Sequence, residues 1–139
     1  MFFKKQNKKN NFDNIDQAIC MLLIHAARVD EIYEDQEKKL IKEYFLKIGK
    51  DKEYIIELVR YCEIKEKDSV EIINMTKEIK KLDYKNRLEI IEIMCKIIYS
   101  DRQLCNFEDR LIRKVSGLIY VENRDVGEIK LKVKNDIYS

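Results

Sequence analysis

Carboxylate side chains are the residues of this chain whose type and spacing most suggest chemistry. The first acidic segment, residues 30–37, holds five acidic residues and no basic one, and its candidate ligands are Asp30, Glu34, Asp35 and Glu37. Oxygen ligands of this kind suit hard cations such as calcium or magnesium. The Asp-to-Glu span of eight residues lacks glycine and is too short for an EF-hand loop. One hypothesis is therefore a divalent-cation site of another kind.

The acidic segment belongs to a repeat with an offset of 71 residues. The stretch ARVDEIYEDQEKKLI (27–41) aligns with IYSDRQLCNFEDRLI (98–112), and Asp30, Glu37, Leu40 and Ile41 recur as Asp101, Glu108, Leu111 and Ile112. In both copies, apolar residues at helical spacing lead to an Asp, a short polar link follows, and helical spacing resumes at a Glu. The pattern predicts a helix-loop-helix unit used twice, with a second acidic segment at 101–109.

The repeated acids also have a purely structural interpretation. At about 100° per residue, Asp30 and Asp101 fall on the apolar faces of their helices and turn inward. An inward carboxylate needs partners, and the free N–H groups at the start of the next helix are the nearest donors. Glu37 and Glu108 can reach back to the cap N–H, as in a capping box. This interpretation requires no bound cation.

Long helices must position these residues, because the 139-residue chain has no proline and only three glycines. The spacing of apolar residues predicts about seven helices in an all-α bundle with two pseudo-symmetric halves. Gly49 is expected to mark the C-terminal end of one helix, and Asp83 the N-terminal end of another. In chain order, one expected helix starts near residue 13, the next spans about 34–48, and a third starts near residue 51. The other four span about 69–82, 84–100, 106–119 and 124–135. The helix at 84–100 is apolar on most sides and should lie in the middle. We expect one domain over 13–139 and a flexible basic tail over 1–12.

Several function classes are disfavoured by composition. The net charge is only +2, so no strong field recruits nucleic acid, and none is expected as a partner. No stretch resembles a membrane span or a secretory signal, which predicts a cytoplasmic protein. The four cysteines form no CxxC motif and are expected to be reduced and buried. His25 is the sole histidine, and no recognisable nucleophile arrangement accompanies it, so no enzymatic activity is predicted.

The two stretches AARVDEIYEDQE and IYSDRQLCNFED carry a family resemblance. An alanine-rich helix end, an Asp, a short link and a Glu, occurring in both halves of a helical domain, resemble the TerB-like family over about residues 13–133. That family includes tellurite-resistance proteins and the N-terminal region of DjlA-type co-chaperones. The resemblance implies a bundle of about seven helices with pseudo-twofold halves, and a role in stress response, tellurite resistance or metal sensing.

Three functional expectations follow. The first is a non-enzymatic, stress-associated interaction module with a protein partner of unknown identity. The alternative is a divalent-cation sensor that uses the acidic segments 30–37 and 101–109. The third is a peripheral membrane-associated or co-chaperone-like adaptor, in which residues 2–9 make at most weak contact with an anionic surface.

Overall fold

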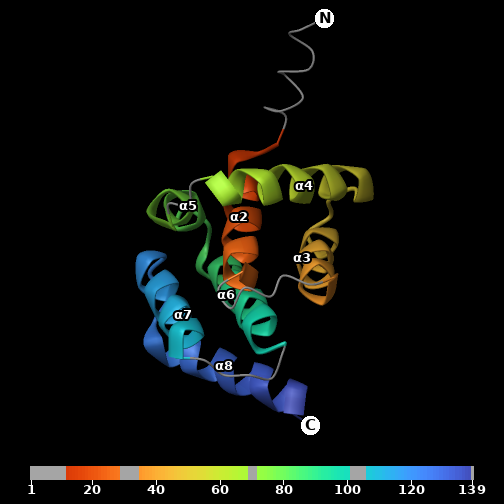
Figure 1. The fold of residues 1–139 in the computed structure, drawn as a ribbon. Coiled ribbons are helices and arrows are strands. Elements are labelled where there is room, and N and C mark those ends of the chain that lie inside the picture. Colours follow the sequence, from red (N-terminus) through yellow and green to blue (C-terminus); the bar gives the residue numbers. More distant parts are fainter. Residues whose placement is uncertain (1–11, 29–34, 69–71, 101–105, 139) are drawn as a thin grey trace, which may run out of the picture.

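The computed structural model describes residues 12–28, 35–68, 72–100 and 106–138, and within these ranges it is a bundle of seven helices with no strand (Figure 1). The all-α prediction is confirmed. The helices are α2 (Asn14–Arg28), α3 (Asp35–Lys47), α4 (Lys52–Asp68), α5 (Ile72–Ile79), α6 (Tyr84–Tyr99), α7 (Asn106–Leu118) and α8 (Asn123–Tyr138). None of the described helices is long and apolar enough to cross a lipid bilayer.

Two helices form the centre of the bundle. Helix α2 packs against α3, α4, α5 and α6, and helix α6 packs against α2, α3, α7 and α8. In Figure 1, α4 crosses one end of this central pair, α8 crosses the other, α3 lies on one side, and α5 and α7 lie on the opposite side. The predicted central position of α6 is therefore confirmed, and α2 shares it.

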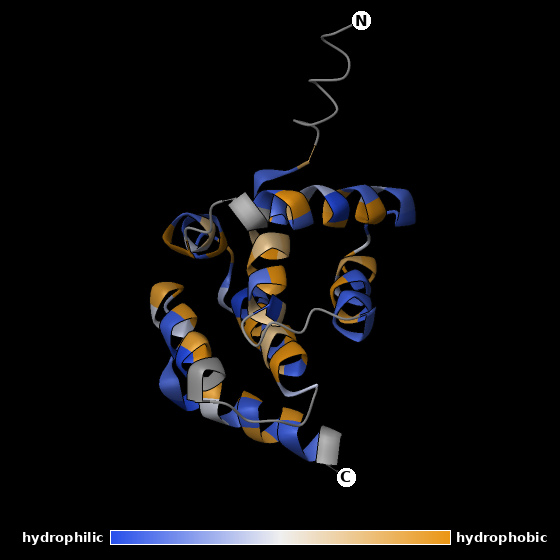
Figure 2. Cartoon of the chain, viewed as in Figure 1, coloured by the Kyte–Doolittle hydropathy of each residue, from blue (hydrophilic) through white to orange (hydrophobic). Residues whose placement is uncertain are grey.

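Apolar spacing explains the core. Nine of the fifteen residues of α2 are buried, and Leu22, Leu23 and Ile24 are fully so. Outer helices such as α3 and α8 show bands of hydrophobic and hydrophilic residues, as amphipathic helices do (Figure 2). Ile48, the last residue of the helix expected over 34–48, continues the apolar spacing but is 41% exposed, because α3 ends at Lys47 and the chain turns at Gly49, whose φ is 94°. That left-handed glycine is the predicted end signal.

The helix bounds follow the 71-residue offset of the sequence repeat. Moved by 71 positions, the bounds of α2, α3 and α4 fall on those of α6, α7 and α8 to within one residue, and α5 lies between the two sets. The repeat thus covers three helices per copy, beyond the helix-loop-helix unit read from the sequence. That the two sets superimpose as pseudo-symmetric halves stays a prediction.

The core begins one residue before the predicted domain boundary. Phe12, assigned to the tail by the sequence analysis, is buried. Its ring lies 5.5 Å from the ring of Tyr54 and 5.3 Å from that of Tyr61, centroid to centroid. Such aromatic contacts bury large apolar area, so Phe12 anchors the start of the described chain to α4.

Candidate functional site

The acidic positions named from the sequence lie at or near the start of α3 and α7. Asp35 and Glu37 are in the first turn of α3, where Asp35 is exposed and Glu37 is buried. Asp30, Glu34 and Asp101 lie outside the described residues, and so does the side chain of Glu108. Among the side chains that are described, no three His, Cys, Asp or Glu residues converge as a metal site requires. The cation site and the inward aspartates therefore stay predictions.

A buried carboxylate that the sequence analysis missed lies at the start of α2. Asp16 is only 2% exposed, the Tyr54 hydroxyl donates to its Oδ2 at 2.7 Å, and the Lys50 ammonium lies 3.2 Å from the same oxygen. A buried charge is stable when paired and hydrogen-bonded in this way. The available signal was its position between Ile15 and Ile19, within the apolar stripe of α2.

The Tyr54 hydroxyl joins the N-terminal ends of α2 and α4, and we call this contact the α2–α4 brace. Besides donating to Asp16, the hydroxyl accepts a hydrogen bond from the Asp13 N–H at 3.3 Å. Burial, and then the hydrogen bond to Asp16, raises the pKa of Tyr54 well above its usual range. The hydrogen bond to Asp16 likewise raises the pKa of Lys50. Both shifts favour the protonated forms that hold the brace together.

A second contact of the same kind joins α6 and α8, and we call it the α6–α8 brace. The Tyr84 hydroxyl accepts from the Glu122 N–H at 3.2 Å and donates to the Asp125 carboxylate. In each brace the Asp that accepts from the hydroxyl stands three residues after the residue whose N–H donates to that hydroxyl: Asp16 after Asp13, and Asp125 after Glu122. The 71-residue offset relates α2 to α6 and α4 to α8, but the two helices of each pair contribute different residues. In the first brace α4 supplies the Tyr and α2 the Asp, whereas in the second α6 supplies the Tyr and α8 the Asp. These side chains lock helix ends together, which is a structural task.

Two buried thiols meet between α2 and α4. Cys20 and Cys62 are fully buried free cysteines, and the Cys62 thiol donates to the Gln17 carbonyl oxygen at 3.9 Å. Burial, and then the neighbouring Cys62, raises the pKa of Cys20 well above its usual range. A thiol must ionise to act as a nucleophile, so this environment disfavours reactivity at Cys20.

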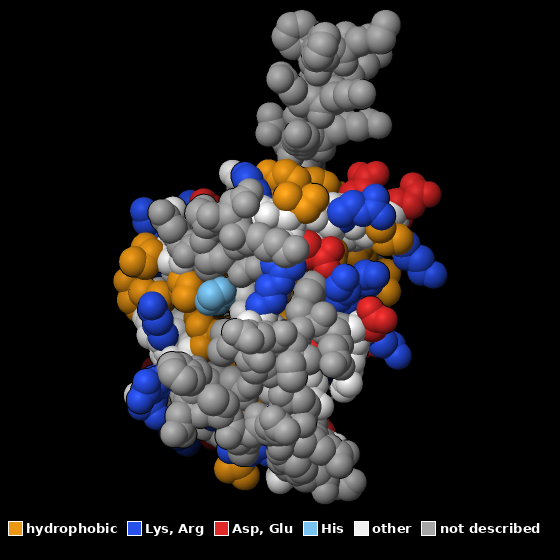
Figure 3. Space-filling view, in the orientation of Figure 1, with side chains coloured by type: hydrophobic (Ala, Val, Ile, Leu, Met, Phe, Trp, Pro, Cys, Tyr) orange, Lys and Arg blue, Asp and Glu red, His pale blue; other side chains and the backbone are white. Residues whose placement is uncertain are grey.

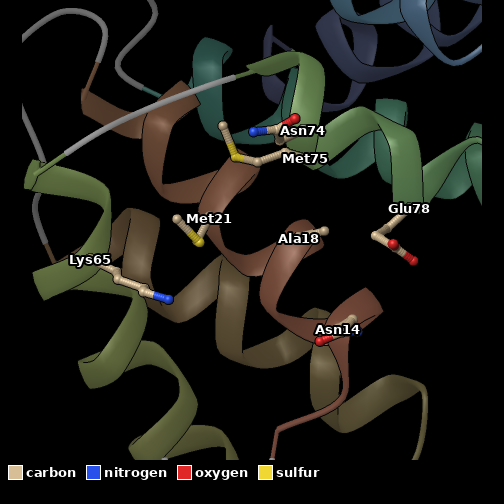
Figure 4. A pocket seen from close by; sticks show the side chains of 7 residues that line it. All are labelled: Asn14, Ala18, Met21, Lys65, Asn74, Met75 and Glu78. Atoms are coloured by element: carbon tan, nitrogen blue, oxygen red, sulfur yellow. The ribbon is translucent and has the colours of Figure 1, made fainter. Parts of the chain in front are cut away.

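The described surface contains a hollow of about 410 Å³ between α2, α4 and α5, which we call the methionine hollow. In Figure 4, the side chains of Met21 and Ala18 lie between Lys65 on one side and Glu78 on the other. The full lining is Asn14, Ala18, Met21, Lys65, Asn74, Met75 and Glu78. Its volume is in the range of small-ligand and side-chain pockets, and its lining combines an apolar floor with charged edges.

The sequence profile of the family described as tellurite resistance protein TerB matches residues 16–131. The chain belongs to this family. The match confirms the resemblance seen in the two signature stretches and runs from Asp16 in α2 to Leu131 in α8. It therefore includes the tyrosine and the carboxylate partner of each brace, and all of the methionine hollow except Asn14. No curated protein and no solved structure matches this TerB-family chain significantly.

Proposed function

We propose that this TerB-family chain is a non-enzymatic, stress-associated module that binds a segment of a partner protein in the methionine hollow. One observation carries the proposal: an apolar floor, to which Met21 and Met75 contribute, lies between a cationic Lys65 and an anionic Glu78. Methionine side chains are flexible and polarisable, and they are over-used at surfaces that accept varied apolar groups. The family description supports a role in tolerance of tellurite.

The charges at the two sides of the hollow define the segment that fits it. Lys65 attracts an acidic residue, and Glu78 attracts a basic one, although Lys81 also lies 3.4 Å from Glu78 and weakens that attraction. An apolar side chain between these charges would cover Met21. The expected ligand is therefore an apolar anchor with an acidic residue on one side.

Complementation of a strain that lacks the gene tests this proposal. The Met21→Arg variant should fail to restore growth on tellurite, because a long cation fills the apolar floor. A matched variant, Glu43→Arg, also introduces an arginine, but on the exposed surface of α3 outside the hollow, and should restore growth like the wild type. Circular dichroism and thermal melting check that both variants fold. Full complementation by folded Met21→Arg would refute the role of the hollow.

Divalent-cation sensing is the second candidate function. It is favoured by one described feature, the burial in the first turn of α3 of Glu37, the last residue of the acidic segment 30–37. Calorimetric titration with calcium, magnesium and zinc tests it. Saturable binding that is lost in Asp30→Asn and accompanied by a rising melting temperature would support sensing, and no heat of binding would contradict it.

A further inference from the structure

The end of α7 holds an aromatic residue in a backbone conformation that favours glycine. Tyr120 has φ of 57° and is the one non-glycine residue with positive φ in the described chain. The Tyr120 N–H donates to the Gly117 carbonyl oxygen at 3.3 Å, and the Val121 N–H donates to that of Ser116 at 2.9 Å. This is a Schellman motif with Tyr120 at its left-handed position. A bulky residue there is strained and calls for a compensating role.

Arg87 fixes the strained turn from the neighbouring helix. Its Nη1 donates to the carbonyl oxygen of Ile119 at 2.8 Å and to that of Tyr120 at 3.3 Å, and its Nε donates to that of Leu82 at 3.1 Å. The backbone at Tyr120 is therefore held by α6 as well as by its own helix. Despite this firm seat, the Tyr120 side chain is 67% exposed. A strained backbone conformation thus places an aromatic ring at the solvent-exposed surface.

The surroundings of the ring are apolar and basic. A hollow of about 170 Å³ lies between α5 and α7 and is lined by Ile73, Thr76, Lys77, Lys80, Gly117, Leu118 and Tyr120, none of them acidic. Ile73 is 60% exposed, and the Lys80 ammonium lies 5.7 Å from the centroid of the Tyr120 ring. Figure 3 shows hydrophobic side chains at the edge of the molecule where α5 and α7 lie, with Lys or Arg side chains beside them.

We infer that this surface, the Tyr120 face, docks an acidic segment of a partner protein that carries an apolar or aromatic anchor. The anchor lies against Tyr120 and Ile73, and acidic side chains on either side pair with Lys77 and Lys80. Aromatic residues at the centre and charges at the rim are the usual arrangement of a binding surface. The Tyr120 face uses the side of α5 opposite to Asn74, Met75 and Glu78, so the inference does not depend on the methionine hollow.

A fluorescent peptide of Glu and Leu residues with one central Phe is a suitable probe, and its anisotropy measures binding to the full chain. Binding should weaken with added salt, and a control peptide with Lys in place of Glu should not bind. Tyr120→Gly should weaken binding about tenfold while the protein stays folded, and Tyr120→Phe should retain it, because the ring is kept. Equal binding by Tyr120→Gly and wild type would overturn the inference.

Two further comparisons locate the site and separate it from a lipid surface. Lys80→Glu should weaken peptide binding, whereas Lys39→Glu, the same charge change on the exposed side of α3, should not. Equal losses in the two variants would mean that net charge alone attracts the peptide, which would contradict a defined face. Phosphatidylserine vesicles provide the last arm. One outcome would overturn the inference in favour of a membrane surface: the wild type sediments with these vesicles, Tyr120→Gly does not, and neither protein binds the peptide.

Discussion

Gly49 and Tyr120 occupy the same position at the ends of α3 and α7, 71 residues apart. Both have positive φ, 94° and 57°. In each motif the N–H of this residue bonds to the carbonyl three residues back, and the next N–H bonds five residues back, at Lys50 and Val121 respectively. The offset of the acidic repeat therefore extends to the helix ends. One copy has the residue that the backbone favours, and the other has an exposed ring.

This relationship predicts opposite effects of two substitutions on stability. Tyr120→Gly should raise the free energy of unfolding by up to about 1 kcal/mol, because it relieves a left-handed tyrosine. Gly49→Ala should lower it by about 1–2 kcal/mol, because an L side chain is then forced into that conformation. Urea denaturation measures both. A marked loss of stability in Tyr120→Gly would show that the ring is a structural element and would weaken the case for a docking face.

The α2–α4 brace should contribute measurably to stability. Tyr54→Phe keeps the ring contact with Phe12 but removes the hydroxyl, which leaves the buried Asp16 carboxylate with one partner fewer. Loss of a hydrogen bond to a buried charged group costs about 1–3 kcal/mol. Chemical denaturation of Tyr54→Phe should show a loss in this range. An unchanged denaturation midpoint would mean that the brace is dispensable.

The α6–α8 brace should contribute less. Tyr84 and Asp125 are both partly exposed, so water can replace the hydroxyl when Tyr84→Phe removes it. We expect a loss of about 0.5–1 kcal/mol, near the ordinary net value of an intramolecular hydrogen bond. Denaturation of Tyr84→Phe beside Tyr54→Phe checks the order of the two. A larger loss in Tyr84→Phe would show that burial does not set the strength of these contacts.

Alkaline pH should destabilise the fold through its tyrosines. Burial, and then the charges of Glu89 and Asp16, raises the pKa of Tyr44 from 10.0 to about 12. Because folding favours the neutral phenol, Tyr44 contributes to the free energy of unfolding, and this contribution is complete below pH 10. It is lost as the pH rises from 10 to 12, at about 1.4 kcal/mol per pH unit. Melting temperatures over this range should fall less steeply in Tyr44→Phe. Parallel pH profiles would contradict the prediction.

Much of the architecture is predictable from the sequence for a simple reason. Apolar residues at helical spacing and the scarcity of proline and glycine identify the helices, and Gly49 and Asp83 identify two ends; the Asn86 N–H donates to the Asp83 carboxylate at 2.9 Å. These are local signals, so they survive without knowledge of packing. The central place of α6 was also predictable, because a helix that is apolar on most sides has to be covered by others.

The braces and the hollows were not predictable in the same way. Asp16 lies within the apolar stripe of α2, but only the packing of α4 brings Tyr54 beside it. Nothing local at Tyr120 predicts that it takes the position that Gly49 has in α3. The methionine hollow depends on how α5 sits against α2 and α4. Such features arise from contacts between residues tens of positions apart, which spacing along one chain does not encode.

Site-specific photo-crosslinking tests the central claim, that the chain works by binding a protein in the methionine hollow, most directly. A benzophenone amino acid replaces Met21 in one version of the protein and the exposed Glu43 in another, and both are irradiated in cells grown with tellurite. We predict one defined protein adduct from position 21, absent from position 43 and lost when Lys65→Glu is added. No adduct from position 21, or the same adducts from both positions, would contradict the proposal.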